Sequence, residues 1–245
     1  MRMTKYLYMG ILLMAGPVFS QEVAKEADPF AGKAALEKFE GSPSWDVTCE
    51  VFSLPLSEAA KLKRLRKSDA EDYAELVQRV ESGKAKQEEF LMLRTTEGAG
   101  TTVEEISEMI YATEYEPPEL PNEIGNLGED IEKAKMLVTP ATPSAFDTKN
   151  VGSTLEVALT AGDDEKVEVR LAMNLVSYLG RQVWGQGLAE SEMPRFALQN
   201  VKTGLEVTPD SPSLIGSISP PEALQPEEGE RQVWLAFVTV SKSKE

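Results

Sequence analysis

Alternation of apolar and polar residues predicts the first strands of the chain. From Trp45 to Val51 every second residue is apolar, and the residues between them are Asp, Thr and Glu. A period of two with one polar face indicates a half-buried strand. This strand covers residues 45–54 and ends at Pro55. Residues 90–96, which read FLMLRTT, predict a second strand that is followed by a turn at Gly98-Ala99-Gly100.

Two helices are expected between these strands. Residues 57–67 place Ala59, Leu62 and Leu65 on one helical face. The sequence Ser68-Asp69-Ala70-Glu71 has the spacing of a capping box, which begins a helix by satisfying its first backbone amides. The second helix carries apolar residues at i, i+3, i+4 and i+7, and Gly83 is a natural C-terminal stop; these apolar residues are Tyr73, Leu76, Val77 and Val80.

The middle of the chain gives weaker signals. Residues 103–111 fit a helix, and they also fit a strand that pairs back onto residues 90–96; periodicity alone leaves both open. Residues 115–130 are acidic and rich in Pro and Gly, which predicts a loop. A short strand is possible at 136–138.

The C-terminal part reads as β structure. Residues 155–159 and 167–173 alternate and are joined by a short turn, which predicts a hairpin. The last strand is apolar on both faces and should therefore lie covered in the centre of a sheet. The later strands are expected at 196–198, 204–207, 214–218 and 231–240. The fold class is thus α+β: a β-rich, sandwich-type domain preceded by a strand-helix-helix unit.

The N-terminus has the pattern of a secretory signal peptide. Arg2 and Lys5 precede a mostly apolar run over 7–19, which is too short for a membrane-spanning helix and is broken by Gly16-Pro17. We expect cleavage after Ser20 and export of the remaining chain. The expected organisation is a signal peptide (1–20), a flexible leader (21–44), the strand-helix-helix unit (45–85) and a β-domain (86–240).

Composition narrows the chemistry. The chain has 41 Asp and Glu against 25 Lys and Arg, a net charge of −16, which argues against nucleic acid as a partner. It has no His, which excludes His-based acid–base catalysis and His-ligated zinc. Cys49 is the only cysteine, so no disulfide can form within the chain. Its place in an alternating strand favours a buried inert thiol over a bridge between chains.

Two groups of residues are candidates for partner binding. The first is a basic cluster on the first helix, which consists of Lys61, Lys63, Arg64, Arg66 and Lys67. Its positive charge would bind an acidic partner or lipid headgroups, although a solvated helix face is the simpler interpretation. Tyr178 and Trp184 lie in a Gly-flanked segment that we expect to be a loop, either covered or presenting its aromatic rings to a sugar or a partner.

Two acidic groups are weaker candidates. Asp163-Asp164-Glu165 would suit calcium by ligand type, but Asp-rich hairpin turns are common. A carboxylate pair for glycoside hydrolysis, drawn from Glu114, Glu116, Glu119 and Glu123, lies in the expected acidic loop. No catalytic residue, metal site or cofactor site is therefore predicted, and the chain is expected not to be an enzyme.

Two sequence segments with a similar residue pattern carry a resemblance to a known family. Residues 146–157 read FDTKNVGSTLEV, and residues 194–207 read PRFALQNVKTGLEV. The first is followed by a returning strand at 167–173, and the chain closes with VWLAFVTV over 233–240. This order, with residues 93–105 as an opening hairpin, resembles the C-terminal domain of secretins, the ring-forming outer-membrane pores of bacterial secretion and pilus systems. The resemblance covers residues 86–240.

The sequence departs from the secretin pattern in two places. Gly216 is followed by Ser217 in place of a second glycine. The membrane hairpin would fall in residues 217–231, which contain three Pro and four Glu and lack the alternating apolar pattern of a spanning strand. We therefore expect no membrane crossing there. The resemblance implies a non-catalytic role, in the periplasm or at the periphery of the outer membrane, through contacts with an envelope protein or through self-assembly. The alternative is a β-sandwich module that binds a polysaccharide or peptide.

Overall fold

A computed structural model describes residues 43–119, 138–162 and 165–243 of the chain, within one compact unit, Ala34–Glu245. The expected signal peptide, all but the last two residues of the leader, and Asp163-Asp164 lie outside the described residues. So do Glu123 and most of the segments expected to be a loop and a short strand, at 115–130 and 136–138.

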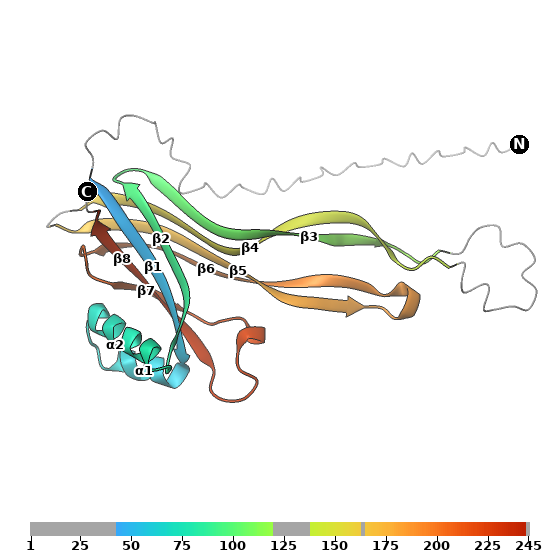
Figure 1. Ribbon diagram of the computed structural model, residues 1–245, viewed down its shortest axis with the longest axis horizontal. Helices are drawn as coiled ribbons and strands as arrows, with labels where there is room; N and C mark the ends of the chain where they lie inside the picture. Colours follow the sequence, from blue (N-terminus) through green and yellow to red (C-terminus); the bar gives the residue numbers. More distant parts are fainter. Residues whose placement is uncertain (1–42, 120–137, 163–164, 244–245) are drawn as a thin grey trace, which may run out of the picture. The chain divides into compact units, whose positions relative to one another are not determined.

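The described residues form two α-helices and two four-stranded antiparallel sheets (Figure 1). The elements in chain order are β1 (Ser44–Pro55), α1 (Leu56–Arg64), α2 (Asp69–Glu81), β2 (Lys86–Thr96), β3 (Gly100–Glu116), β4 (Thr142–Ala161), β5 (Val167–Trp184), β6 (Ser191–Val207), β7 (Ser213–Ile218) and β8 (Gln232–Lys242). Two short 3-10 helices, η1 (Gly187–Ala189) and η2 (Glu222–Leu224), lie in the connections. The expected α+β fold class is confirmed.

The first sheet has the strand order β2-β1-β8-β7. Its central strands are buried on both faces, as the double-sided apolar pattern of 233–240 predicted. Val47, Cys49 and Val51 of β1 point toward the second sheet, whereas Phe52 and Leu54 point toward the helices. Because side chains alternate along a strand, β1 and β8 contribute to two separate cores.

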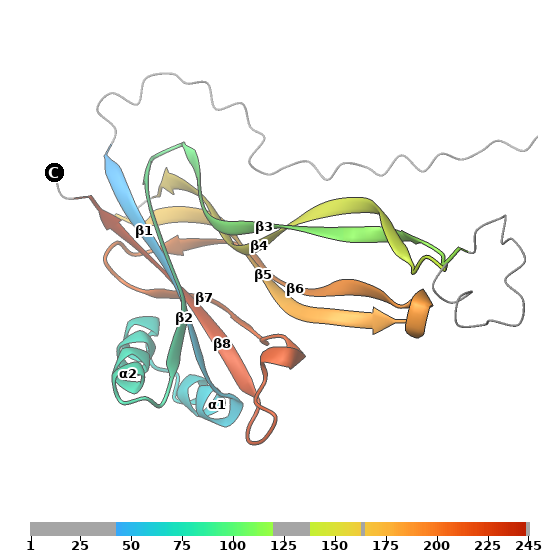
Figure 2. The same cartoon turned by 45° about the vertical axis from the view of Figure 1, so that its right-hand side comes forward.

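The sheet core lies between the two sheets and contains inward-facing residues of β1, β2, β8, β4 and β5. The helix core lies on the opposite face of the first sheet, where Leu62 of α1 and Leu76 of α2 are fully buried against Phe52 and Phe237. The helices therefore cover one face of the first sheet and the second sheet covers the other (Figure 2). Residues 45–85 and 86–240 share this sheet and both cores, because β1 pairs with β2 and β8.

The capping box predicted at Ser68 is present. The Ser68 hydroxyl accepts a hydrogen bond from the Glu71 amide at 3.3 Å, and the Glu71 carboxylate accepts one from the Ser68 amide at 2.9 Å. Gly83 follows the helix with φ of +70°, a left-handed conformation that glycine adopts without strain. Both ends of α2 are thus where the sequence predicted them.

The second sheet has the order β3-β4-β5-β6. Its two middle strands pair only over residues 152–161 of β4 and 167–176 of β5, where Gly152 faces Val176 at one end and Ala161 faces Val167 at the other. Beyond that point the sheet divides into two distal hairpins, one of residues 107–116 with 142–151 and one of residues 177–184 with 191–197 (Figure 2). Gly152 stands at the division with φ of +132°, and a Cβ there would lie 2.0 Å from the Glu105 carbonyl oxygen. Only glycine fits this position.

Three expectations need correction. Residues 103–111 belong to strand β3, which excludes the helix, but β3 pairs with β4 and not with residues 90–96. Tyr178–Trp184 continues strand β5 and is not a loop; Gly180, with φ of +95°, lies at an irregularity in the pairing with β6 rather than at a turn. The strands expected at 196–198 and 204–207 are one continuous strand. The segment Tyr178–Trp184 is part of an exposed ribbon, which lacks the alternation that a buried face imposes.

Residues 219–231, where a secretin would have its membrane hairpin, contain no strand and one 3-10 turn, η2. The Gln225 side-chain amide accepts from the Gln232 amide at 2.8 Å and donates to the Gln232 carbonyl at 3.2 Å. The Glu230 carboxylate accepts from the Ser57 amide and hydroxyl at 2.5 and 2.8 Å. This connection is therefore tied to α1 and β8. In the part of the chain that is described, neither helix has the length and hydrophobicity of a membrane-spanning helix.

Candidate functional site

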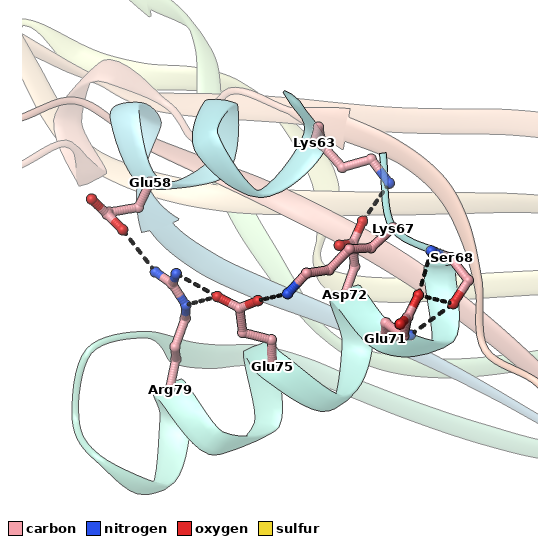
Figure 3. A network of polar contacts seen from close by, with 8 residues as sticks. All are labelled: Glu58, Lys63, Lys67, Ser68, Glu71, Asp72, Glu75 and Arg79. Carbon is pink, nitrogen blue, oxygen red and sulfur yellow. Dashed lines mark hydrogen bonds and ion pairs between the residues drawn. The ribbon is translucent and has the colours of Figure 1, made fainter. Parts of the chain in front are cut away.

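The basic cluster predicted on α1 is largely paired within the molecule. Lys67 contacts Glu75 of α2 at 3.0 Å, and Arg79 of α2 contacts both Glu75 at 2.6 Å and Glu58 of α1 at 3.0 Å (Figure 3). Lys61 contacts the same Glu58 at 2.6 Å. Arg79 with Glu58 joins the two helices, and Lys67 with Glu75 joins the turn between them to α2, whereas the pair of Lys61 with Glu58 lies within α1. The cluster is therefore for the most part paired with neighbouring carboxylates rather than a free positive surface.

Lys63 makes the most buried contact of this network. Its Nζ lies 2.7 Å from Oδ2 of Asp72, whose side chain is fully buried, and 3.1 Å from Oδ1 of Asp69. Burial works to lower the pKa of Lys63, but its hydrogen bonds to Asp72 and Asp69 outweigh burial and raise that pKa overall. The other Asp72 oxygen, Oδ1, is buried without a protein hydrogen-bond partner. Asp69 also accepts a bond from the Leu214 amide at 3.0 Å, which ties α2 to β7.

Arg64 and Arg66 have no ion pair among the described residues. Both are exposed, and Leu65 between them is 63% exposed. Of the five predicted basic residues, these two alone remain as a positive surface, at the turn between α1 and α2.

The two predicted aromatic residues fall in different surroundings. Trp184 is the last residue of β5 and is 54% exposed. Tyr178 packs against Phe196 of β6 at 6.0 Å between ring centroids, and Phe196 packs against Tyr111 of β3 at 5.5 Å. Because Tyr111 belongs to the other distal hairpin, the three rings connect the two hairpins.

A cavity of about 290 Å³ lies between the distal hairpins. Tyr115 forms one wall, and its hydroxyl donates to the Glu192 carbonyl oxygen at 2.7 Å. Arg181 and Glu192 form an ion pair at 2.8 Å beside it. The pKa of Arg181 is raised by its hydrogen bonds to Glu192 and to Tyr178. The lining also includes Tyr111, Phe146, Tyr178 and Pro194.

Of the residues that line this cavity, sequence reasoning singled out only Tyr178 as a candidate for binding; it missed the others, among them Tyr111, Tyr115, Phe146, Arg181 and Glu192. Tyr111 lies in residues 103–111, for which the sequence fitted both a helix and a strand, and Tyr115 lies in the expected acidic loop. Phe146 lies in residues 146–157, one of the two segments that resemble secretins. Glu192 carried no signal at all. Three tyrosines and a phenylalanine near strand ends were a visible clue, but only strand pairing brings them together.

Cys49 is fully buried, and its Sγ lies 3.6 Å from Sδ of Met173. Burial, with smaller contributions from Glu50 and Glu89, raises its pKa to about 12. A thiol that is neither accessible nor ionised is inert, as the strand pattern predicted. A bridge between chains through Cys49 would require the sheet core to open.

Three of the acidic candidates for a carboxylate pair, Glu114, Glu116 and Glu119, lie within the described residues. Glu114 and Glu116 are exposed on β3, and Glu119 is exposed at an isolated bridge to Thr139. Within residues 43–119, 138–162 and 165–243 no group of His, Cys, Asp or Glu has a geometry that would hold a metal ion.

Two long edges of the second sheet are open. β3 and β6, of 17 residues each, pair only with β4 and β5, respectively, in the described chain. β3 carries five Glu and no basic residue, whereas β6 carries two basic residues, Arg195 and Lys202, and two acidic ones, Glu192 and Glu206. Glu104 and Lys202 project from the face opposite the sheet core, because their neighbours Val103 and Val201 pack against that core. The two edges therefore differ in charge and present unpaired backbone groups.

No protein-family model and no curated protein matches this sequence. Among solved structures, the chain is similar to the InvG secretin domain β-barrel of the Salmonella SPI-1 injectisome, with 10% identity and a TM-score of 0.45 over 83% of this chain and 64% of that one. It is also similar to the type II secretin GspD of enteropathogenic Escherichia coli, with 10% identity and a TM-score of 0.41 over 83% and 70%.

A third similar structure is the type IV competence pilus secretin PilQ of V. cholerae, with 12% identity and a TM-score of 0.41 over 83% of this chain and 62% of that one. The chain thus spans less than two thirds of the InvG and PilQ chains. These solved structures are secretins, the family that residues 146–157 and 194–207 resemble. At these TM-scores the function of those proteins is not transferred to this chain.

Proposed function

We propose that this protein is a non-catalytic exported component of a bacterial envelope secretion or pilus-type assembly, and that it acts by pairing the β3 edge of one copy with the β6 edge of the next. The observation that supports this proposal is the pair of open edges of the second sheet, of which β3 is strongly acidic and β6 carries as many basic as acidic residues. Pairing of an unpaired strand edge satisfies its backbone groups and is a recurring mode of protein association.

The geometry of the sheet favours a head-to-tail contact. Strands alternate in direction across β3-β4-β5-β6, so β6 of one copy and β3 of the next would continue the antiparallel pattern. A heterologous contact of this kind closes into a ring or extends into a filament. Opposite charges on facing strands, such as Lys202 and Glu104, add about 0.2–1 kcal/mol per pair.

Crosslinking between introduced cysteines tests this contact. Cys49 is buried and un-ionised, so it does not interfere. Within one copy positions 104 and 202 lie in the part of the sheet where β4 and β5 separate β3 from β6, roughly 14 Å at about 4.8 Å per strand, which is too far for a disulfide. The double variant Glu104→Cys with Lys202→Cys should therefore crosslink only between copies and give a ladder of oligomers.

Other registers between the two strands are tested by combining Glu104→Cys with Leu198→Cys or with Asn200→Cys, because Leu198 and Asn200 lie on the same face of β6 as Lys202. Each single variant is the matched control and should give at most dimers. If no pair gives a ladder longer than a dimer, the proposed contact between edges is wrong.

A further inference from the structure

The cavity between the distal hairpins combines flat rings with a small number of polar groups. Tyr111 and Tyr178 line it from two strands, and both pack against Phe196. Phe146 and Ile110 lie at its edge and are 62% and 72% exposed. An aromatic-rich concave surface with a few converging polar groups is the usual form of a small-molecule site.

The charges of the lining cancel. Arg181 and Glu192 are the two ionisable groups of opposite sign in the wall, and they pair at 2.8 Å. The guanidinium offers several donors in a planar fork, and the carboxylate beside it is an acceptor. Donors and an acceptor at neighbouring positions match adjacent hydroxyl groups, each of which both donates and accepts. A ligand with a net charge would meet one repulsive partner in this pair.

The size of the cavity limits the ligand further. At about 290 Å³ it lies at the lower limit of ligand sites, which span about 300–1,000 Å³. This volume suits a single ring with its substituents better than an extended peptide.

We propose that this cavity binds one ring of a neutral saccharide, which stacks on Tyr178 or Tyr111 and hydrogen-bonds to Arg181 and Glu192. The site lies between the distal parts of β3 and β6, away from Glu104 and Lys202, and binding of a small molecule there goes beyond the proposed assembly role. It also moves the ligand site away from Trp184, which does not line the cavity and is half exposed at the end of β5.

Saturation-transfer NMR on the purified full chain tests the proposal. The probes are two neutral tetrasaccharides, cellotetraose and chitotetraose, with tetragalacturonate as a charged probe and decaproline as a peptide probe. At least one neutral tetrasaccharide should receive saturation from the protein and bind with a dissociation constant on the order of 1 mM, as expected for a contact with a single ring.

Variants locate the site. Tyr178→Ala and Arg181→Ala should each weaken binding by about tenfold, and Trp184→Ala on the same hairpin should leave it unchanged. Tyr178→Leu keeps the apolar bulk without a flat ring and should lose binding as well, which separates stacking from folding. The mass of the assembly should be the same in all four variants.

Three results would overturn the proposal. They are no binding of either neutral tetrasaccharide, an equal loss of binding in Trp184→Ala, and Tyr178-dependent binding of decaproline or tetragalacturonate in place of the neutral probes. None of these results bears on the crosslinking between edges, so the two proposals fail independently.

Discussion

The hydroxyl of Tyr73 on α2 donates a hydrogen bond of 2.6 Å to Oε2 of Glu50 on β1. The Glu50 side chain is buried between the first sheet and the helices, and its other oxygen accepts from Gln87 Nε2 at 2.9 Å. The Tyr73 ring contacts Phe52 and Phe237 edge-on, both at 5.7 Å between centroids. One residue thus joins α2 to the helix core and satisfies a buried carboxylate.

Removing this hydroxyl should destabilise the fold. Tyr73→Phe keeps the aromatic contacts but leaves a buried carboxylate oxygen without its donor, which costs about 1–3 kcal/mol. Tyr115→Phe is the control, because its hydroxyl bond to the Glu192 carbonyl is exposed and its loss should cost less. Urea unfolding followed by circular dichroism measures both. Equal midpoints for parent and Tyr73→Phe would show that the Glu50 contact does not matter.

The same contact predicts a pH dependence. Burial and the hydrogen bond to Glu50 raise the pKa of Tyr73 to about 12, whereas a tyrosine in an unfolded chain has a pKa of about 10. Between these values the folded state holds a proton that the unfolded state has released. The stabilisation is therefore complete below about pH 10 and is lost as the pH rises toward 12. Unfolding midpoints measured across this window should fall more steeply for the parent than for Tyr73→Phe.

Lys63 should contribute more to stability than the other lysines of the cluster. Lys63→Met leaves the carboxylate of the fully buried Asp72 without its cation, and breaking a buried pair on one side costs about 3 kcal/mol. Lys61→Met breaks a pair with Glu58 at the surface, where the expected change is within about 1 kcal/mol. Thermal and urea unfolding compare the two variants. Similar losses in both would show that the burial of Asp72 has no energetic consequence.

The Cys49 thiol should report on opening of the sheet core. Because it is fully buried and its pKa is raised to about 12, the native protein should not react with a thiol reagent such as Ellman's reagent at pH 8. In urea the same thiol should react completely, with a midpoint that matches unfolding. Rapid labelling of the native protein would contradict the packing of Cys49 against Met173.

Elements with at least one buried face could be predicted from the sequence. The alternation of Trp45 to Val51, the capping box at Ser68 and the apolar run of 233–240 each encode their surroundings locally, and all three form as predicted. The distal hairpins could not be predicted. Their residues face water on most sides, so alternation is weak, and Gly180 indicated a turn where the strand continues through an irregularity.

The candidate surfaces show the same division. A run of basic residues on a helix is visible in the sequence. Whether Lys61, Lys63 and Lys67 form ion pairs depends on Asp and Glu residues of α1 and α2, most of which come after the run in the sequence. The ring contacts of Tyr111 with Phe196 and of Tyr178 with Phe196 join strands up to 85 positions apart. Contacts of this kind depend on strand register, which local patterns do not specify.

The mass of the purified protein in solution tests the central proposal, pairing between the β3 and β6 edges, most directly. Mass photometry and light scattering should show multiples of the 26.9 kDa chain. Glu104→Lys should shift the population toward the monomer, because this Lys would then face Lys202 of the neighbouring copy. Glu222→Lys on η2 changes charge away from both edges and should leave the mass unchanged. A protein that is monomeric at every concentration, or a mass that is the same in all variants, would contradict pairing between these edges.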